Sequence, residues 1–330
     1  MLKSISFDAI HIPCPILLAP LSGISDVPFR HAVLEYWAGM VYSEMIASRT
    51  QIQDVKGSLK LIEKAQNQQY SAIQLAGYEP YYISEAVKIN TDLGADLIDL
   101  NFGCPAKKIV TNVAGSALMH PDNFDRAVSI IEAAVTATTL PVTLKMRLGW
   151  DDDTHNGDKL AKIAQDLGIK LITVHGRTRC QFYKGSADWQ AIAKIREATT
   201  LPLIVNGDII DTKSAKQALQ QSGADGIMIG RASCGKPWLL EALKSEIQAN
   251  TLYSPPAITT QIKNMIAHYR HIIEFYGEKV GMRIGRKHLH WYRESLGLDP
   301  ALKDMINTQT NSESVIESLL ENTQQYERTS

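Results

Sequence analysis

Eight short apolar runs, separated by longer amphipathic stretches, most constrain the fold of this chain. They lie at residues 16–19, 40–44, 72–75, 97–101, 142–147, 171–175, 203–206 and 226–229. A run such as 171–174 (Leu-Ile-Thr-Val) is nearly free of polar groups, which is typical of strands buried on both faces of a parallel sheet. The alternation up to about residue 247 predicts repeated βα units, and eight of them match a closed (β/α)8 TIM barrel.

The chain is long enough for one large barrel and a small second domain. Asp211 is a plausible N-cap for the helix that follows it, and Gly223 supplies the stop. Residues 250–256 end in two consecutive prolines and read as a linker. Beyond them the apolar pattern is helical at 268–276, 281–296 and 312–326, so we predict a barrel over 1–249 and an all-helical C-terminal domain over 257–330.

Composition excludes several functional classes. The formal net charge of -1 argues against a protein that coats nucleic acid nonspecifically, because such binding neutralises many phosphates. No run approaches the ~18 apolar residues of a membrane span, and no basic leader is evident, so we expect a cytoplasmic protein without a membrane partner. Cys14, Cys104, Cys180 and Cys234 lie far apart, which predicts free thiols rather than a zinc site or disulfides. No obligate protein partner is implied.

Polar residues follow nearly every apolar run, where a barrel places its active site. They are Pro20, Glu44, Gln74, Asn101 with Cys104, Lys145, His175, Asn206 with Asp208, and Gly230 with Arg231. One or two such residues could be strand-end hydrogen-bonding groups, but a full ring favours a functional site.

Gly207 follows the seventh run and Gly230-Arg231 follows the eighth. Barrels commonly hold a phosphate there with backbone N–H groups, a helix N-terminus and a cation. A phosphorylated cofactor would fit this position. Taken singly, each glycine could equally serve only a tight turn.

Lys145 and His175 end the fifth and sixth runs and would place a cation and a hydrogen-bond donor at the barrel mouth. A lysine there could stabilise the anionic pyrimidine edge of a reduced flavin. A Schiff base or a salt bridge are the alternatives for Lys145, and His175 could be an ordinary strand-end histidine. Without a second ligand at suitable spacing, no metal site is predicted.

Cys104 begins a connection much longer than the ~2–6 residues typical of βα loops, and long barrel loops are usually lids or substrate-binding elements. We expect its thiol to be exposed and mobile. Cys14, Cys180 and Cys234 are interpreted as small buried apolar residues.

These residues resemble the tRNA-dihydrouridine synthase family, most closely its bacterial B-type branch, over nearly the whole chain. The most specific segment is 101–108 (Asn-Phe-Gly-Cys-Pro-Ala-Lys-Lys). Further support comes from segments 19–26, 144–147, 174–178, 206–208 and 229–231. Phe102 and Leu21-Ser22 depart from the family's commoner Met and Met-Ala, and Phe102 could alter packing around the uracil.

The resemblance implies an FMN enzyme that uses NADPH to reduce the C5=C6 bond of a uridine in the D-loop of tRNA. It implies FMN contacts from Pro20, Leu21, Ser22, Gln74, Lys145, His175, Asn206, Gly207, Asp208, Gly230 and Arg231. Flavin N5 would pass hydride to C6, and Cys104 would protonate C5, since an ordinary thiol holds its proton near neutral pH.

The resemblance also implies tRNA as the substrate, contacted near the target base by Asn101, Lys107, Lys108 and Arg177. Arg283, Arg286, Lys287 and His290 fall at i, i+3, i+4 and i+7 on one helical face, with Arg293 near its edge. Such a basic stripe is usually a solvated face, but the resemblance favours phosphate recognition. Two rivals remain: an FMN enzyme of a free pyrimidine, like dihydroorotate dehydrogenase, and a non-catalytic tRNA-binding module.

Overall fold

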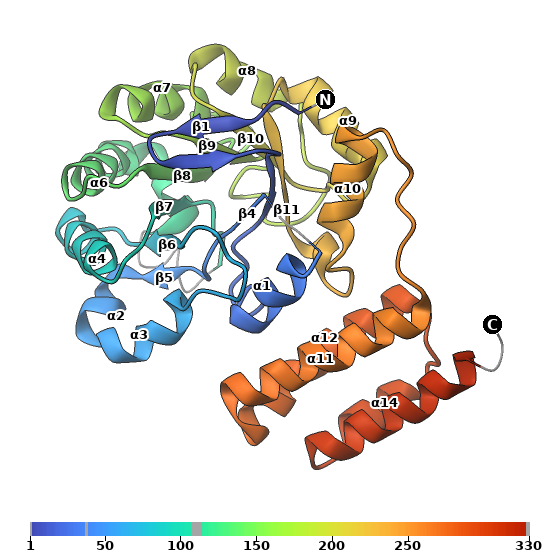
Figure 1. The fold of residues 1–330 in the computed structure, drawn as a ribbon. Coiled ribbons are helices and arrows are strands. Elements are labelled where there is room, and N and C mark those ends of the chain that lie inside the picture. The colour runs from blue at the N-terminus through green and yellow to red at the C-terminus, as the bar shows by residue number, and fades with distance from the viewer. Residues whose placement is uncertain (1, 37–38, 107–113, 328–330) are drawn as a thin grey trace.

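One curled sheet of nine parallel strands forms the centre of the computed structural model, which describes residues 2–36, 39–106 and 114–327 (Figure 1). In spatial order the strands are β4 (Met40–Val41), β3 (Ile16–Leu18), β11 (Gly226–Ile229), β10 (Leu203–Asn206), β9 (Ile172–His175), β8 (Val142–Arg147), β7 (Leu97–Phe102), β6 (Ala72–Ala76) and β5 (Ile46–Ala47). All eight predicted runs contribute to this sheet.

The segment 40–47 closes the sheet into a barrel. β4 pairs with β3, whereas a bridge from Tyr42 to Ala72 and the short strand β5 connect the same segment to β6. The predicted strand 40–44 is interrupted because the Ser43 hydroxyl, instead of a backbone carbonyl, accepts a hydrogen bond from the Gln74 N–H at 3.0 Å. β4 and β5 therefore share the second strand position, and the predicted (β/α)8 class is confirmed.

A hairpin that we did not predict, β1 (Ile5–Phe7) with β2 (Ile10–Ile12), precedes the barrel. Its three isoleucines, Ile5, Ile10 and Ile12, belong to one buried cluster with residues such as Leu97, the first of β7, and Leu171, which directly precedes β9. Both leucines lie at the amino ends of their strands. The hairpin therefore covers the end of the barrel opposite the catalytic face.

Helices cover the outside of the sheet, where the second and larger apolar cluster lies. They are α1 (Val27–Leu34), α2 (Ser48–Gln53), α3 (Val55–Ile62), α4 (Pro80–Asp92), α6 (Phe124–Thr136), α7 (Gly157–Leu167), α8 (Ala191–Ala198), α9 (Thr212–Ser222) and α10 (Leu239–Gln248). The predicted ends of α9 are confirmed. Asp211 forms a capping box with Ser214, and Gly223 has the left-handed conformation (φ 66°).

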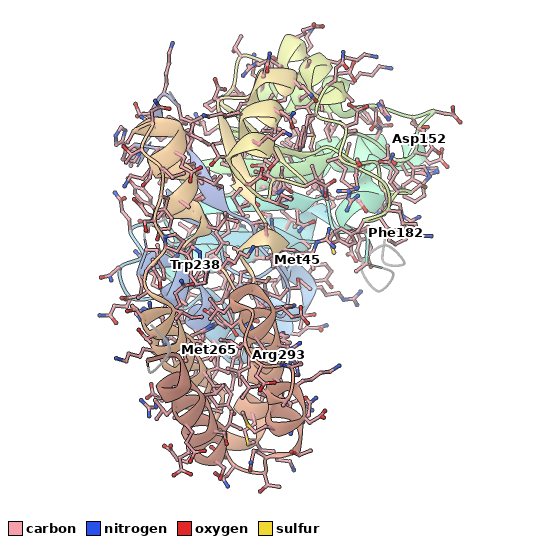
Figure 2. All side chains as sticks on the ribbon, turned by 90° about the vertical axis from the view of Figure 1, so that its right-hand side faces the viewer. Met45, Asp152, Phe182, Trp238, Met265 and Arg293 are labelled. Atoms are coloured by element: carbon pink, nitrogen blue, oxygen red, sulfur yellow. The ribbon has the colours of Figure 1, made fainter. Side chains whose placement is uncertain are left out.

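Beyond an extended segment at 251–256 the chain is helical, with α11 (Ile258–Tyr276), α12 (Glu278–Leu296), α13 (Leu302–Thr308) and α14 (Ser312–Glu327). α11 begins ten residues before the predicted start at 268, because Ile258, Ile262, Met265 and Ile266 already follow the helical period. α13 was not predicted. These helices share a core that also takes in Trp238 from the barrel. Figure 2 shows this helical region, with Met265 and Arg293, below the barrel.

In the part of the chain that the structure describes, every helix is too short or too polar to cross a membrane.

Candidate active site

Five neighbouring strands, β6 to β10, each carry one of the predicted polar residues, in the middle of β6 and near or at the carboxyl end of the other four. These are Gln74, Asn101, Lys145, His175 and Asn206, and all five side chains are buried. Asn101 is the register partner of Lys145, and His175 is the partner of Asn206. The Lys145 ammonium crosses β9 to donate to Asn206 Oδ1 at 3.2 Å, so the lysine lies inside the mouth of the barrel.

A chain of hydrogen bonds connects the backbone of Cys104 to the buried carboxylate of Asp99. Asn101 Oδ1 accepts from the N–H groups of Gly103 and Cys104, and Asn101 Nδ2 donates to Gln74 Oε1 at 2.7 Å. Gln74 Nε2 then donates to Asp99 Oδ2 at 2.7 Å, and the Thr143 hydroxyl donates to the other oxygen. Because an ionised carboxylate only accepts, Asp99 fixes the orientation of both amides.

Replacing Asp99 with asparagine should destabilise the protein most at low pH. Burial raises the pKa of Asp99 to about 6, above its value of about 3.8 in the unfolded chain. The ionisation of Asp99 therefore lowers the stability of the wild type as pH rises from 4 to 6, and the asparagine variant lacks this contribution. The destabilisation measured by urea unfolding should be larger at pH 4.5 than at pH 7, by on the order of 2 kcal/mol. An equal difference at both pH values would contradict this.

Cys104 is half-buried, so the expectation of an exposed thiol was wrong for this residue. Its N–H is held by Asn101, and its carbonyl oxygen accepts from the N–H and the hydroxyl of Ser116, at 3.1 and 2.9 Å. Ser116 belongs to a 3-10 helix at Gly115–Met119. The long connection therefore starts from a fixed point, and Cys104 is held at the rim beside Lys145.

The other three cysteines behave differently from one another. Cys14 is buried, as predicted, and Cys234 is half-buried. The prediction for Cys180 was wrong: this thiol is exposed, because it lies in a surface loop after β9, close to the Arg179 guanidinium.

The electrostatics at the mouth suit an anionic ligand. Burial, and then the neighbouring Arg147, lower the pKa of Lys145 to about 8. Its acceptor, Asn206, is a neutral amide that also donates to the Met228 carbonyl oxygen. A buried ammonium held by a neutral group is complementary to the anionic edge of a bound cofactor.

His175 is held in its neutral form. Burial first, and then the cations Arg147, Lys145, Arg177 and Arg231, keep the pKa of His175 well below its usual range. Arg177 Nη1 lies 3.2 Å from His175 Nε2, and a guanidinium can only donate. Nε2 is therefore the acceptor and Nδ1 carries the proton, so His175 offers one N–H donor.

Arg177 itself is almost fully enclosed by protein groups. Nη2 forms a 2.6 Å ion pair with Asp208, and the guanidinium also donates to the carbonyl oxygens of Lys184 and Gly185. Asp208 further accepts from the Ala187 N–H at 2.8 Å. These contacts connect the loop after β9 to the turn after β10. The substrate contact expected of Arg177 stays a prediction.

Two glycines follow the adjacent strands β10 and β11. Gly207 has φ +112°, and a Cβ there would lie 2.7 Å from His175 Cδ2, so only glycine fits. At Gly230 a Cβ would meet only Leu21 and Ala19, at 3.9 and 4.0 Å, which leaves open space above the backbone. The exposed Arg231 follows in a short 3-10 turn. The residues present thus fit a phosphate group.

Two side chains at the mouth, those of Arg147 and Tyr183, were not predicted as site residues from the sequence. The buried Arg147 donates to the carbonyl oxygens of Gly103, Thr178 and Phe182, at 2.7, 2.7 and 2.8 Å, and so joins the Cys104 segment to the loop after β9. The half-exposed Tyr183 lies between Arg147 and Arg231, whose guanidinium carbons are 5.5 and 4.8 Å from the ring centroid. Arg147 could have been found, because it follows Lys145 by two residues on the same strand face.

Phe102 faces away from the mouth. It belongs to the outer cluster, between the sheet and its helices, with Leu100 and Leu118. Its departure from the family pattern therefore changes packing in the outer layer rather than directly at the barrel centre. Pro20 and Leu21 are half-buried and Ser22 is exposed, in the turn after β3.

The basic stripe on α12 is not one uniform exposed face. Arg283 is exposed and Arg286 is half-buried. The Lys287 ammonium donates to the Gly23 carbonyl oxygen, and His290 Nε2 lies 3.0 Å from Asn307 Oδ1. Arg293 is paired with Glu294. Lys107 and Lys108 lie outside the described residues.

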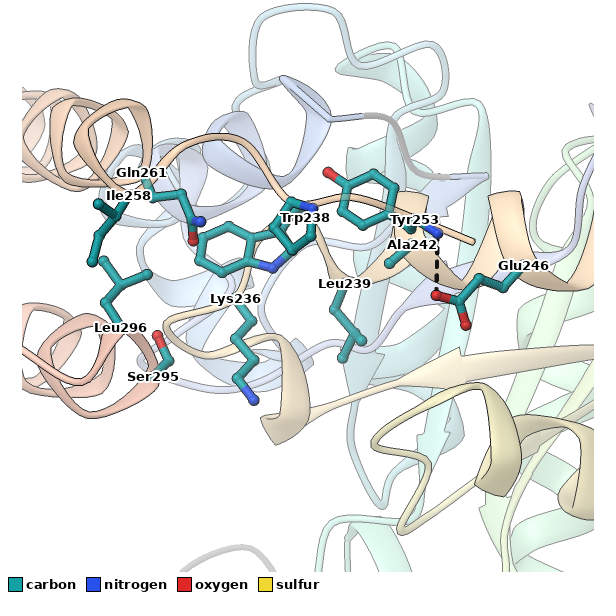
Figure 3. A pocket seen from close by; sticks show the side chains of 11 residues that line it. Lys236, Trp238, Leu239, Ala242, Glu246, Tyr253, Ile258, Gln261, Ser295 and Leu296 are labelled. Atoms are coloured by element: carbon teal, nitrogen blue, oxygen red, sulfur yellow. Dashed lines mark hydrogen bonds between the residues drawn. The ribbon is translucent and has the colours of Figure 1, made fainter. Parts of the chain in front are cut away.

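A cavity of about 450 Å³ lies outside the barrel, between α10 and the C-terminal helices (Figure 3). Trp238, Tyr253, Gln261 and Ser295 are among its lining residues, and Glu246 accepts from the Tyr253 N–H at 3.3 Å. It shares no residue with the predicted site.

A solved structure with the same fold is similar to this protein over most of its length. Morphinone reductase matches with a TM-score of 0.56 over 79% of this chain and 93% of its own, at 12% identity, a likeness that shows the barrel fold alone. The dihydrouridine synthase (Dus) family model matches residues 17–328. The chain belongs to the dihydrouridine synthase family, which confirms the predicted family and the predicted class of flavin-dependent oxidoreductase.

Relatives match over most of their length. A probable tRNA-dihydrouridine synthase from Rickettsia bellii is 46% identical, with 94% of this chain and 95% of the relative covered. tRNA-dihydrouridine synthase B from Xanthomonas campestris is 42% identical, with 84% and 83% covered. The match to the Rickettsia relative, 313 residues long, therefore takes in both the barrel and most of the helical region.

Proposed function

We propose that this protein is a cytoplasmic tRNA-dihydrouridine synthase that uses FMN and NADPH to reduce a uridine of the D-loop. In this proposal the barrel, residues 1–249, carries the chemistry, and the helical domain, residues 257–330, binds tRNA. The observation that supports it most directly is the position of Cys104, whose backbone is held by Asn101 beside the buried cation Lys145.

FMN is assigned to the mouth of the barrel, and when bound it supplies hydride to C6 of the uracil. Gly207, Asp208, Gly230 and Arg231 would hold its phosphate. Lys145, His175, Gln74 and Asn206 would contact its ring edge, and Pro20, Leu21 and Ser22 would contact it from the side of β3. A buried ammonium and a neutral Nδ1–H donor at the ring edge stabilise added negative charge.

Cys104 is assigned as the proton donor to C5. Its thiol lies at the rim, where a base drawn out of the tRNA would reach it, and the second N–H of the Asn101 amide nitrogen could donate to the same base. Arg177, Lys107 and Lys108 complete the predicted contacts around the target nucleotide. Arg147 keeps the Cys104 segment and the loop after β9 at a fixed separation.

The direct test uses purified protein and tRNA that lacks dihydrouridine. We expect a yellow protein that oxidises NADPH in proportion to the dihydrouridine formed, and mapping of the product identifies the uridine. Protein without flavin that cannot be reconstituted with FMN would leave only a tRNA-binding module. Activity on a free pyrimidine without tRNA would favour the rival enzyme class.

Replacing Arg283 with alanine should weaken tRNA binding, because this is the exposed cation of the α12 stripe. If it neutralises one phosphate, the slope of log affinity against log salt should become less steep by roughly 1. A salt titration of tRNA affinity measures this. The exposed Lys194 on α8 lies on the barrel, away from the helical region, and Lys194→Ala is the matched control. An unchanged slope for Arg283→Ala would assign tRNA docking to another surface.

A further inference from the structure

The turn after β3 is held by a residue of the helical region. The Gly23 N–H donates to Glu44 Oε1, and the Gly23 carbonyl oxygen accepts from Lys287 Nζ of α12. Gly23 has φ +74°, and a Cβ there would lie 3.6 Å from the Lys287 nitrogen. Both polar groups of the Gly23 residue are thus bound, one by the barrel and one by the helical region.

A second contact from the helical region holds the end of the same turn. Asp26 Oδ1 accepts from the Phe29 N–H at the start of α1, at 3.0 Å, and Asp26 Oδ2 accepts from the Tyr276 hydroxyl, also at 3.0 Å. Tyr276 is the last residue of α11. Helices α11 and α12 of the C-terminal region therefore both form hydrogen bonds with the turn between β3 and α1.

The positive charge of Lys287 stabilises two carboxylates where α12 meets the turn after β3. Glu44 and Asp26 are buried carboxyl groups, and burial raises the pKa of both, that of Asp26 to about 6. Lys287 lowers the pKa of each, so its ammonium favours their ionised forms. A phosphate contact would have to compete with these carboxylates and with the Gly23 carbonyl.

Hydrogen bonds within the turn connect Gly23, which Lys287 holds, to Leu21. The Leu21 N–H donates to Ser25 Oγ at 2.8 Å, and the Leu21 carbonyl oxygen accepts from the N–H groups of Ile24 and Ser25, each at 2.9 Å. The Leu21 side chain reaches Gly230, since a Cβ on that glycine would lie 3.9 Å from Leu21 Cδ2. Residues 21–25 therefore form one internally bonded unit between Lys287 and the proposed phosphate turn.

We propose that Lys287 is a positioning residue for the flavin site: from the helical region it holds Gly23, and through Gly23 it sets the place of Leu21 and Ser22. This inference rests on the proposed function, which puts FMN against these two residues. It makes the helical region a structural part of the flavin site as well as the tRNA-binding domain.

The test measures FMN affinity without tRNA. For Lys287→Met we expect the Kd for FMN, from titration of flavin fluorescence, to rise about tenfold, because a charge-assisted hydrogen bond is lost. Lys287→Arg should restore most of the affinity, and Tyr276→Phe should raise the Kd by less. Lys279→Met, an exposed lysine on the same helix, is the matched control and should bind FMN as the wild type does.

The outcomes separate the two proposals. An unchanged FMN Kd in Lys287→Met, with weaker tRNA binding, would overturn the inference and assign Lys287 to the tRNA surface. If Lys287→Met does not fold, an unchanged FMN Kd in Tyr276→Phe would overturn it instead. Wild-type protein that binds no FMN would refute the proposed function itself.

Discussion

Replacing Cys104 with alanine should abolish dihydrouridine formation and leave the reduction of bound flavin by NADPH nearly unchanged. The thiol is assigned only to the protonation of C5, so its loss removes a step that follows hydride transfer to the flavin. Removal of a positioned general acid typically costs a factor of roughly 10²–10⁴ in rate. Single-turnover reduction of the flavin and product formation on tRNA, measured separately, distinguish the two steps.

Two cysteine controls make this result specific. Cys180 is exposed in the loop after β9, and Cys180→Ala should keep full activity. Cys104→Ser keeps a hydroxyl in place and preserves the backbone contacts of residue 104, yet a hydroxyl is a far weaker acid. It should be nearly as inactive as Cys104→Ala. Normal dihydrouridine formation by either Cys104 variant would contradict the assignment.

Replacing Lys145 with methionine should slow flavin reduction by NADPH by roughly 10²-fold, because a preorganised charge beside the developing anion is lost. Lys145→Arg keeps the charge and should retain most of the rate. The measurement is stopped-flow reduction of the flavin without tRNA. Equal rates in Lys145→Met and the wild type would remove this lysine from the chemistry.

The pH dependence provides a second test of Lys145. Burial lowers the pKa of Lys145 to about 8, below the ordinary value of 10.5. The rate of the wild type should fall as pH rises through this region, because the ammonium is lost. Since the pKa is lower in the folded than in the unfolded chain, this same residue makes the protein more stable as pH rises from 8 to 10.5. A loss of rate there without a loss of stability identifies titration rather than unfolding.

The barrel could be predicted because each of its strands is an apolar run with helix-forming sequence on either side. The hairpin β1–β2 could not, since strands of three residues show no usable period. The break between β4 and β5 depends on one side-chain hydrogen bond of Ser43, which pattern analysis does not reveal. α13 is similarly short, with seven residues.

The ring of candidate residues could be predicted from position alone, since the carboxyl ends of parallel strands meet at one face. Asp99 was missed because it lies inside its strand, and only its bonds to Gln74 and Thr143 show that it orders the site. The helical period placed Lys287 on a basic face. It could not show that this face packs against the turn after β3, and only the tertiary contact with Gly23 reveals this.

The hairpin β1–β2, which covers the amino ends of the strands, has a consequence for the order in which the two substrates bind. In the described part of the chain, Ile5, Ile10 and Ile12 cover the amino ends of the strands, so the flavin proposed here would be reached through the opposite mouth. The nicotinamide and the uracil both have to approach the same reactive atom of the flavin, so they have to occupy that opening in turn. With NADPH as the proposed reductant, we therefore expect NADP⁺ to leave before the tRNA enters, which corresponds to a double-displacement scheme with parallel lines in reciprocal plots.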